Sequence, residues 1–148
     1  MVFKKRQVSK VIIINNQGNY LLQLRDGNPC IDFPFHWTLV GGVVDAGEDH
    51  RQAIVRELRE ELGLIYNELD YFMDFQFNNT VQHIYILKDE IKVSKIDLSE
   101  GVSVKWFTYL ELRGIKIAFN YHDIIRRFHN GDRFCPGSGS RKKILSPK

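Results

Sequence analysis

The chain has 148 residues, which is the length of one ordinary domain and short for two. Hydrophobic residues make up 43% and charged residues 26%, a composition typical of a globular protein and not of a disordered one. The net charge is +3, but four basic residues fall among the last twelve positions, so the remainder is nearly neutral. A near-neutral body argues against a dedicated nucleic-acid-binding protein, which would carry a basic face.

The two cysteines, Cys30 and Cys135, form no CxxC pair, which argues against a disulfide framework or a zinc site. Reduced thiols are typical of a cytosolic protein. The apolar run after Lys10 is too short for a signal peptide, and no window approaches the roughly 20 apolar residues of a membrane span. We therefore expect a cytoplasmic protein with no membrane association.

The first part of the chain predicts a hairpin. Two apolar runs, residues 8–14 and 20–25, flank a turn rich in Asn and Gly. Their continuous apolar character predicts strands that are covered on both faces. Residues 26–34 contain Gly and Pro and predict a loop, and residues 37–40 predict a short strand that runs into Gly41 and Gly42.

Helical spacing of apolar residues predicts a helix over 49–62, and Gly63 stands where a glycine commonly ends a helix. Strands are predicted over 70–77, 81–87 and 102–108, a single helical turn over 109–113, and a last helix over 121–128. This order predicts an α+β fold, an α/β/α sandwich around a mixed sheet. We expect a single domain over residues 1–136 and a flexible basic tail over residues 137–148.

Three carboxylates, Glu57, Glu60 and Glu61, fall within an arc of roughly 100° on the predicted helix, beside its apolar stripe. Like charges at this spacing cost about 0.2–0.5 kcal/mol per pair, and a divalent cation between them would reverse that sign. Ligands that are all oxygen suit a hard ion, Mg²⁺ or Mn²⁺. The same letters also describe an ordinary solvated helix face on which Arg56 and Arg59 neutralise the acids.

The residues around this helix extend the pattern. Gly42 is followed by five residues and Glu48, then by seven residues and the run Arg56-Glu57-Leu58-Arg59-Glu60-Glu61-Leu62-Gly63-Leu64. This segment resembles the Nudix box and fills every position that the box specifies. The run from Trp37 to Gly42 resembles the family's Trp-x-x-Pro-Gly-Gly, with Val40 in place of proline, and Ser99-Glu100-Gly101 before Trp106-Phe107 resembles its late strand. The resemblance extends over about residues 8 to 128.

Nudix proteins mostly hydrolyse a nucleoside diphosphate linked to another group, so the resemblance implies a MutT-like pyrophosphohydrolase in which water attacks phosphorus. The substrate would be a nucleoside diphosphate derivative or a (deoxy)nucleoside triphosphate, with an oxidised purine nucleotide as one option. The implied cofactor is Mg²⁺ or Mn²⁺, and its implied ligands are Glu57, Glu60, Glu61 and Gly41.

The resemblance also implies roles for neighbouring residues. Arg56 would orient a catalytic carboxylate, and Glu48 and Gly63 would support the loop and helix. The general base is either Glu57 or Glu100. Residues implied to contact substrate are Gly42, Trp37 and Asn120.

Substrate identity depends on weaker signals. Seven aromatic residues are candidates either to stack on a nucleobase or to fill the core: Phe33, Phe35, Trp37, Phe75, Phe77, Phe119 and Tyr121. An Asn resembling Asn120 reads the purine edge in the oxidised-purine triphosphatase branch, whereas the alternative role of Asn120 is an N-cap for the last helix. Asn79 stands where the ADP-ribose branch has proline, which weakens that interpretation. We expect no special role for His83.

Three other functions compete with this interpretation of the sequence. The isopentenyl diphosphate isomerase branch uses a catalytic cysteine, and the contexts of Cys30 and Cys135 do not resemble it. A Nudix-like module that binds a nucleotide or sugar nucleotide without cleaving it usually has a degraded box, whereas this box is whole. An RNA-binding role through Arg141, Lys142 and Lys143 rests on a weak electrostatic footprint. The expected partner is a small nucleotide, with no membrane and no specific nucleic acid, and a homodimer is left open.

Overall fold

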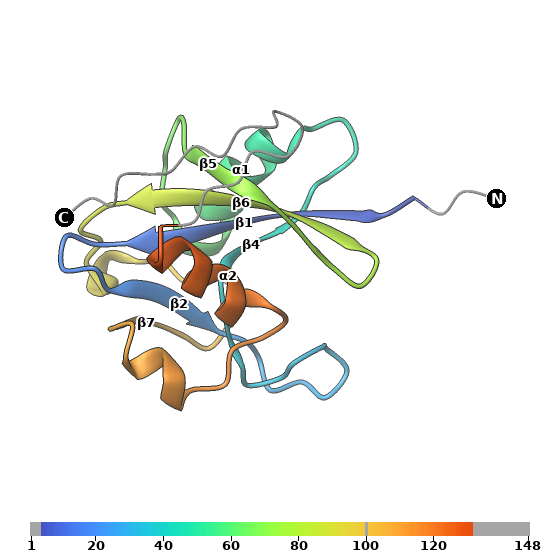
Figure 1. Ribbon diagram of the computed structural model, residues 1–148. Coiled ribbons are helices and arrows are strands. Elements are labelled where there is room, and N and C mark those ends of the chain that lie inside the picture. The colour runs from blue at the N-terminus through green and yellow to red at the C-terminus, as the bar shows by residue number, and fades with distance from the viewer. Residues whose placement is uncertain (1–3, 100, 132–148) are drawn as a thin grey trace.

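The computed structural model describes residues 4–99 and 101–131 (Figure 1). The strands are β1 (Arg6–Ile14), β2 (Tyr20–Leu24), β3 (Trp37–Thr38), β4 (Val40–Val43), β5 (Asp70–Phe77), β6 (Thr80–Lys88) and β7 (Ser103–Phe107). The α-helices are α1 (His50–Leu62) and α2 (Tyr121–His129), and two short 3-10 helices are η1 (Val93–Lys95) and η2 (Glu111–Gly114).

The strands form one mixed sheet in which β1 is central. Its path is β3-β2-β1-β6-β5, with β7 paired to β2 and β4 paired to β1. β1 runs parallel to β6 along its whole length and antiparallel to both β2 and β4. β2 and β4 share one edge of β1, because β2 pairs with Ile13 and Ile14 while β4 pairs with residues 8–11. This arrangement places Gly41 directly opposite Lys10.

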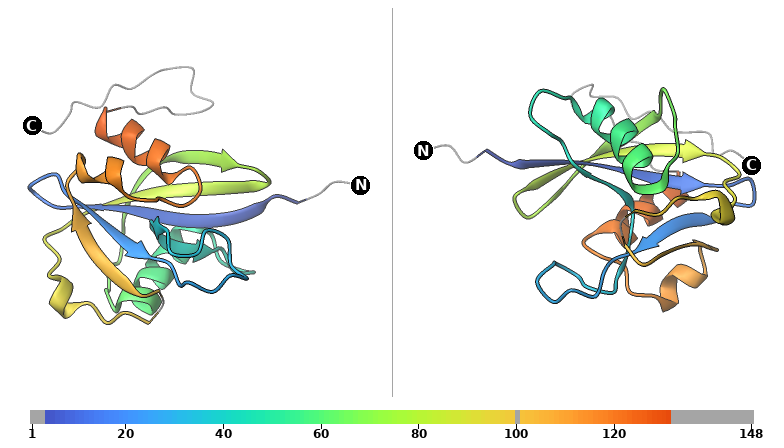
Figure 2. Two further views of the ribbon diagram at one scale, coloured as in Figure 1. Left: turned by 90° about the horizontal axis from the view of Figure 1, so that it is seen from below. Right: turned by 180° about the vertical axis from the view of Figure 1, so that it is seen from behind.

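The two α-helices cover opposite faces of the sheet (Figure 2). Side chains of β1 alternate between them: Ile12 joins the core cluster on the α2 side, and Val11 and Ile13 join the cluster on the α1 side. All three side chains are fully buried, so β1 is covered on both faces as its apolar sequence predicts. The predicted α+β sandwich around a mixed sheet is confirmed.

The predicted hairpin, the strands predicted over 70–77, 81–87 and 102–108, and both predicted helices form, with bounds shifted by at most two residues. The predicted strand over 37–40 is instead two strands that divide at Leu39. Trp37 and Thr38 pair with β2, whereas Val40 and the residues after it pair with β1, so the chain changes neighbour between them. The predicted helical turn over 109–113 is the 3-10 helix η2.

Some predictions fall outside the described residues. These are the basic tail over 137–148, the candidate base Glu100 and Cys135. Among residues 4–99 and 101–131, no helix has both the length and the apolar composition needed to cross a bilayer.

Candidate active site

Helix α1 is fixed at both ends by local hydrogen bonds. The side chain of Asp49 accepts a hydrogen bond from the amide of Gln52 at 2.7 Å, and the Gln52 side chain accepts one from the amide of Asp49 at 2.9 Å. Gly63 ends the helix with φ of 69°, a conformation that glycine adopts without strain. The buried apolar side of the helix packs on the sheet, so the three carboxylates beside it are held at defined positions.

The three carboxylates of α1 differ in environment. Glu61 is buried, and its Oε2 accepts a hydrogen bond from the amide of Gly41 at 3.1 Å. The Glu57 side chain is only 13% exposed and lies against Gly42, while the Glu60 side chain is 53% exposed. The helix therefore presents carboxylates from the edge of the core out to solvent, all on the side that faces β4.

Arg56 ties these acids to the loop before the helix. Its guanidinium makes two hydrogen bonds to Glu48, at 2.6 and 3.0 Å, and donates to Glu57 at 2.9 Å and to Glu60 at 3.0 Å. A further bond to the carbonyl of Val43, at 3.1 Å, reaches the end of β4. Arg56 thus orients two of the predicted metal ligands, and Glu48 anchors Arg56.

This arrangement shifts the pKa of two carboxyl groups in opposite directions. Hydrogen bonds from Arg56 lower the pKa of Glu48 below its ordinary value. Burial raises the pKa of Glu57, and the nearby Arg56 opposes that rise only in part. Arg56 therefore offsets only part of the cost of burying the ionised Glu57 carboxylate. Additional positive charge beside Glu57 would offset the rest.

Gly41 and Gly42 allow two close approaches. A Cβ on Gly41 would lie 2.0 Å from the carbonyl oxygen of Ser9 on β1, and its φ of 139° is one that other residues rarely adopt. A Cβ on Gly42 would lie 2.6 Å from Oε1 of Glu57. Gly41 is therefore needed for strand pairing, and Gly42 leaves room for a carboxylate.

Lys10 is a site residue that the sequence analysis missed. Its side chain is almost fully buried, and Nζ donates to the carbonyl of Gly41 at 2.9 Å and to that of Leu39 at 3.4 Å. The ammonium also lies 5.8 Å from the centre of the Tyr121 ring. A single lysine within the apolar run of β1 was the available signal, since lysine is rarely buried without a partner.

Two cavities meet at Lys10. The first, of about 440 Å³, is lined on the α2 side by Phe33, Phe77, Phe119, Tyr121 and Gln82, with Arg6, Arg25 and Asp32 among its polar residues. The second, of about 480 Å³, is lined by Glu61, Gln23, Asp26, Ser99 and others. Both include Lys10, Arg25 and Gly41. The first cavity is within the size range of small-molecule sites and has aromatic walls.

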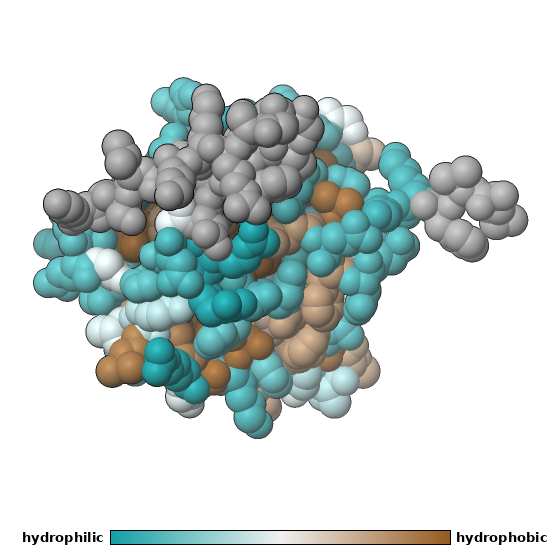
Figure 3. All heavy atoms as spheres, viewed as in Figure 1, coloured by the Kyte–Doolittle hydropathy of each residue, from teal (hydrophilic) through white to brown (hydrophobic). Residues whose placement is uncertain are grey.

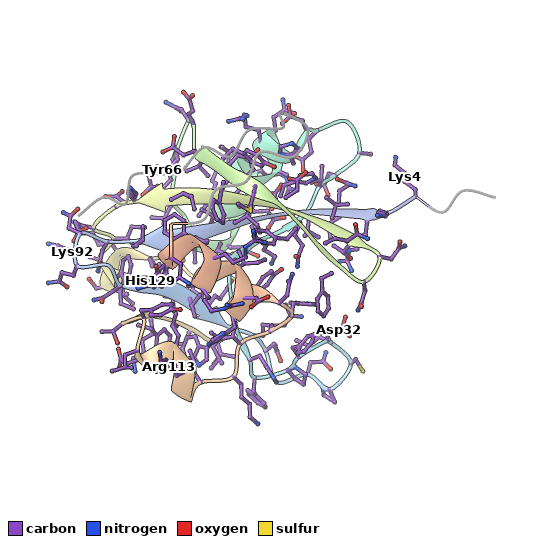
Figure 4. The ribbon with its side chains drawn as sticks, in the orientation of Figure 1. Lys4, Asp32, Tyr66, Lys92, Arg113 and His129 are labelled. Carbon is purple, nitrogen blue, oxygen red and sulfur yellow. The ribbon has the colours of Figure 1, made fainter. Side chains whose placement is uncertain are left out.

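The loop that closes one side of the first cavity carries Asp32, labelled in Figure 4, which faces the turn between β5 and β6. Apolar side chains gather on the same part of the surface in Figure 3. Two of the aromatic wall residues, Phe33 and Phe119, have a backbone φ of 53°. The centres of their rings lie 4.7 Å apart. Strained backbone of this kind is often found at ligand sites.

Four of the seven candidate aromatic residues line the first cavity, and Phe35, Trp37 and Phe75 are in neither cavity. Trp37 packs edge-on against Phe107, with ring centres 4.7 Å apart, and belongs to the apolar layer under α2. Phe35 is 63% exposed. Trp37 therefore packs in the core and does not line either cavity.

Asn120 occupies the N-cap position of α2, but its side chain makes no capping hydrogen bond. Its Oδ1 is buried without a hydrogen-bond partner, and the residues lining the two cavities do not include Asn120. The structure therefore places Asn120 at the N-cap position without a side-chain cap, and its role in reading a nucleobase stays a prediction.

The donor set around α1 matches a hard divalent ion in chemistry, since it is all oxygen and includes the mostly buried Glu57. Among residues 4–99 and 101–131, no three His, Cys, Asp or Glu side chains converge closely enough to form a complete metal site. The carbonyl of Gly41 is engaged by Lys10 and keeps a second lone pair.

Comparison with known proteins identifies the family. The NUDIX domain model matches residues 4–128, and the chain belongs to the Nudix family. An 8-oxo-dGTP diphosphatase of Haemophilus influenzae is 42% identical over 72 residues, which cover 48% of this chain and 51% of that protein. A nucleoside triphosphatase NudI of Salmonella arizonae is 47% identical over 51 residues, covering 34% of this chain and 36% of that protein. The matches thus span about half or less of these curated relatives.

Solved structures support the same fold. A MutT protein from Methanosarcina mazei superposes with a TM-score of 0.66 at 21% identity, covering 88% of this chain and 97% of that one. The NUDIX domain of Shewanella oneidensis NrtR, solved with ADP ribose, superposes with a TM-score of 0.72 at 16% identity, covering 87% and 89%. At these identities the likeness concerns the fold alone.

Proposed function

We propose that this protein is a divalent-metal-dependent pyrophosphohydrolase that cleaves a nucleoside diphosphate linked to another group, or a (deoxy)nucleoside triphosphate. The observation that carries the proposal is the complete Nudix box, whose carboxylates on α1 face the Gly41–Gly42 strand beside a cavity of nucleoside size. The named activities of the diphosphatase and triphosphatase relatives support this class of substrate.

The nucleoside would occupy the first cavity, where Phe33 and Phe119 offer aromatic faces to a nucleobase. The phosphates would extend past Lys10 and Arg25, the two cations common to both cavities, toward Glu61 in the second. Positive charge at this junction and negative charge at the catalytic helix would fix the direction in which the substrate binds.

Glu57, Glu60 and Glu61, with the carbonyl of Gly41, would hold Mg²⁺ or Mn²⁺. Bound there, the ion would neutralise the phosphate oxygens and favour attack by water. In the reaction, the water oxygen bonds to phosphorus, one P–O bond of the diphosphate breaks, and a carboxylate accepts the proton. Arg56 holds Glu57 and Glu60 in place, and the general base is Glu57 or Glu100.

The test is a panel of nucleoside triphosphates, nucleoside diphosphate sugars and ADP-ribose, incubated with Mg²⁺ or with chelator, with release of nucleotide and phosphate followed. The proposal expects Mg²⁺-dependent release from at least one substrate class. Tight binding of a nucleotide with no turnover on any member of the panel would instead identify a non-hydrolytic binding module. Comparing Glu57→Gln with Glu100→Gln would then assign the base, because only the base variant should show an altered pH profile in turnover.

A further inference from the structure

Among the described residues, Gln82 and Asn120 each have a buried side-chain oxygen without a hydrogen-bond partner, and of the two only Gln82 lines a cavity. It lies on β6, is 2% exposed and lines the first cavity on the α2 side. Its Oε1 is fully buried and makes no hydrogen bond. A buried carbonyl oxygen left unpaired has lost its hydrogen bonds to water without replacing them, so a protein seldom keeps one without a use.

The two ends of the Gln82 amide differ in their surroundings. Gln82 lines the first cavity together with Tyr121. Its Oε1 is a buried atom without a hydrogen-bond partner among the described residues, whereas its Nε2 is not. The carbonyl end is therefore the free acceptor.

The surroundings of this acceptor match those of a nucleobase site. Phe77, Phe119 and Tyr121 line the same cavity, and the Phe77 and Phe119 rings meet edge-on with centres 5.8 Å apart. Aromatic walls hold the face of a planar ring, and one polar group on the floor can then read its edge. A lone acceptor selects a ligand that offers an N–H.

We propose that Gln82 determines the nucleobase specificity of this site: its carbonyl oxygen accepts a hydrogen bond from an N–H of the bound base. The inference rests on the proposed function in placing a nucleotide in the first cavity. A base with an amino or imino N–H at the edge facing Gln82 binds more tightly than an analogue that has an acceptor, or no donor, at the same position.

The test measures binding of nucleoside monophosphates by calorimetry, in matched pairs that differ in one N–H donor. The pairs are GMP with IMP, AMP with purine riboside monophosphate, and CMP with pyrimidin-2-one riboside monophosphate, in each of which the second member lacks only the amino group. In at least one pair, the wild-type protein should bind the N–H-bearing member about 10-fold or more tightly. Gln82→Met and Gln82→Leu, which remove the acceptor, should bring that ratio close to one.

Gln76→Leu is the matched control, because Gln76 lies on β5 next to Gln82's pairing partner but is exposed and outside both cavities. This variant should keep the wild-type ratio. A preference that survives in the Gln82 variants, or no preference in any pair, would overturn the proposal. Failure of both variants to fold would also overturn it, because it would show that the protein itself pairs this amide.

This design separates the specificity proposal from the proposed hydrolysis. Monophosphate binding requires no turnover, so a Gln82-dependent preference without hydrolysis would support the specificity role and contradict the enzymatic one. Hydrolysis by the wild-type protein, with the base preference unchanged in the Gln82 variants, would support the enzymatic proposal and contradict the specificity role of Gln82.

Discussion

The Nζ of Lys10 lies 2.9 Å from the carbonyl oxygen of Gly41, directly across the β1–β4 pair. The amide of the same glycine donates to Glu61 at 3.1 Å. One peptide segment thus connects a buried ammonium that lines both cavities to a buried carboxylate of α1. This segment is where the two cavities meet.

Replacing Lys10 with Met should lower kcat/KM for the preferred nucleotide by at least about 10-fold, because a buried cation that holds Gly41 and faces the phosphate path is lost. Steady-state kinetics on the best substrate of the panel would measure this change. Lys88→Met, at the exposed end of β6, is the control and should leave kcat/KM unchanged. Equal kinetics for wild type and Lys10→Met would show that Lys10 serves only the fold.

The ion pair between Arg56 and Glu48 should stabilise the protein in a pH-dependent way. Glu48→Gln should reduce the free energy of unfolding at pH 7 by about 1–2 kcal/mol, because one charge-assisted pair is weakened. The pKa of Glu48 is lowered in the folded state, so this stabilisation is present above its unfolded pKa of about 4.5 and is lost as the pH falls through the folded value. Urea unfolding at pH 7 and pH 3 should therefore show a difference between wild type and variant at pH 7 that shrinks at pH 3.

Gly41 and Gly42 should respond differently to alanine. Gly41→Ala should cost more than about 3 kcal/mol of unfolding free energy, because its Cβ would collide with the backbone of Ser9. Gly42→Ala should mainly reduce turnover, because its Cβ would displace the Glu57 carboxylate. Thermal melts and kinetics measured together separate the two effects. Gly114→Ala, where a Cβ meets nothing within 4 Å, is the control, and a Gly42 variant with normal turnover would contradict the placement of Glu57.

His50 should make stability fall on mild acidification. Its ring stacks on His83 with centres 4.0 Å apart, and Nδ1 lies 2.6 Å from the hydroxyl of Tyr85. Burial, with the nearby His83, lowers the pKa of His50, so the unfolded state takes up its proton first as the pH falls below about 6.5. The free energy of unfolding should therefore drop between pH 7.5 and 5.5, and His50→Gln should reduce that drop.

His122→Gln, on an exposed position of α2, is the matched control for this pH dependence and should keep the wild-type drop. His129, whose pKa is also lowered by burial, contributes in the same direction, so the His50 variant should retain part of the effect. A drop that is identical in wild type and His50→Gln would contradict the assignment.

The sequence predicted those parts of the fold that depend on local patterns. The apolar spacing of α1, its Asp49 start and its Gly63 end are signals within one segment, and the helix forms with those bounds. The sharing of one β1 edge by β2 and β4 is not such a signal, because it depends on pairings between distant residues. This is why the strand at 37–40 was predicted as one piece.

For the candidate site, too, the local motif predicted some residues and only the folded structure revealed others. The box motif identified Glu48, Arg56 and the three glutamates, and the structure places Arg56 in contact with Glu48, Glu57 and Glu60. Lys10 and Gln82 were not predicted, because each is one of several polar residues in its strand and only the packed sheet shows that it faces a cavity. Trp37 packs against Phe107 in the apolar layer under α2, and its predicted contact with substrate stays a prediction, since an aromatic residue beside a motif fits either role.

The most direct test of the central claim is the turnover of Glu57→Gln, Glu60→Gln and Glu61→Gln with saturating Mg²⁺, beside the exposed control Glu68→Gln. Each box variant removes the charge of a proposed ligand with little change in shape. The account predicts that kcat for each falls by at least about 10²-fold while circular dichroism and the control remain as in wild type. Near-normal turnover in folded Glu60→Gln and Glu61→Gln would contradict the assignment of this helix as the metal-binding catalytic element.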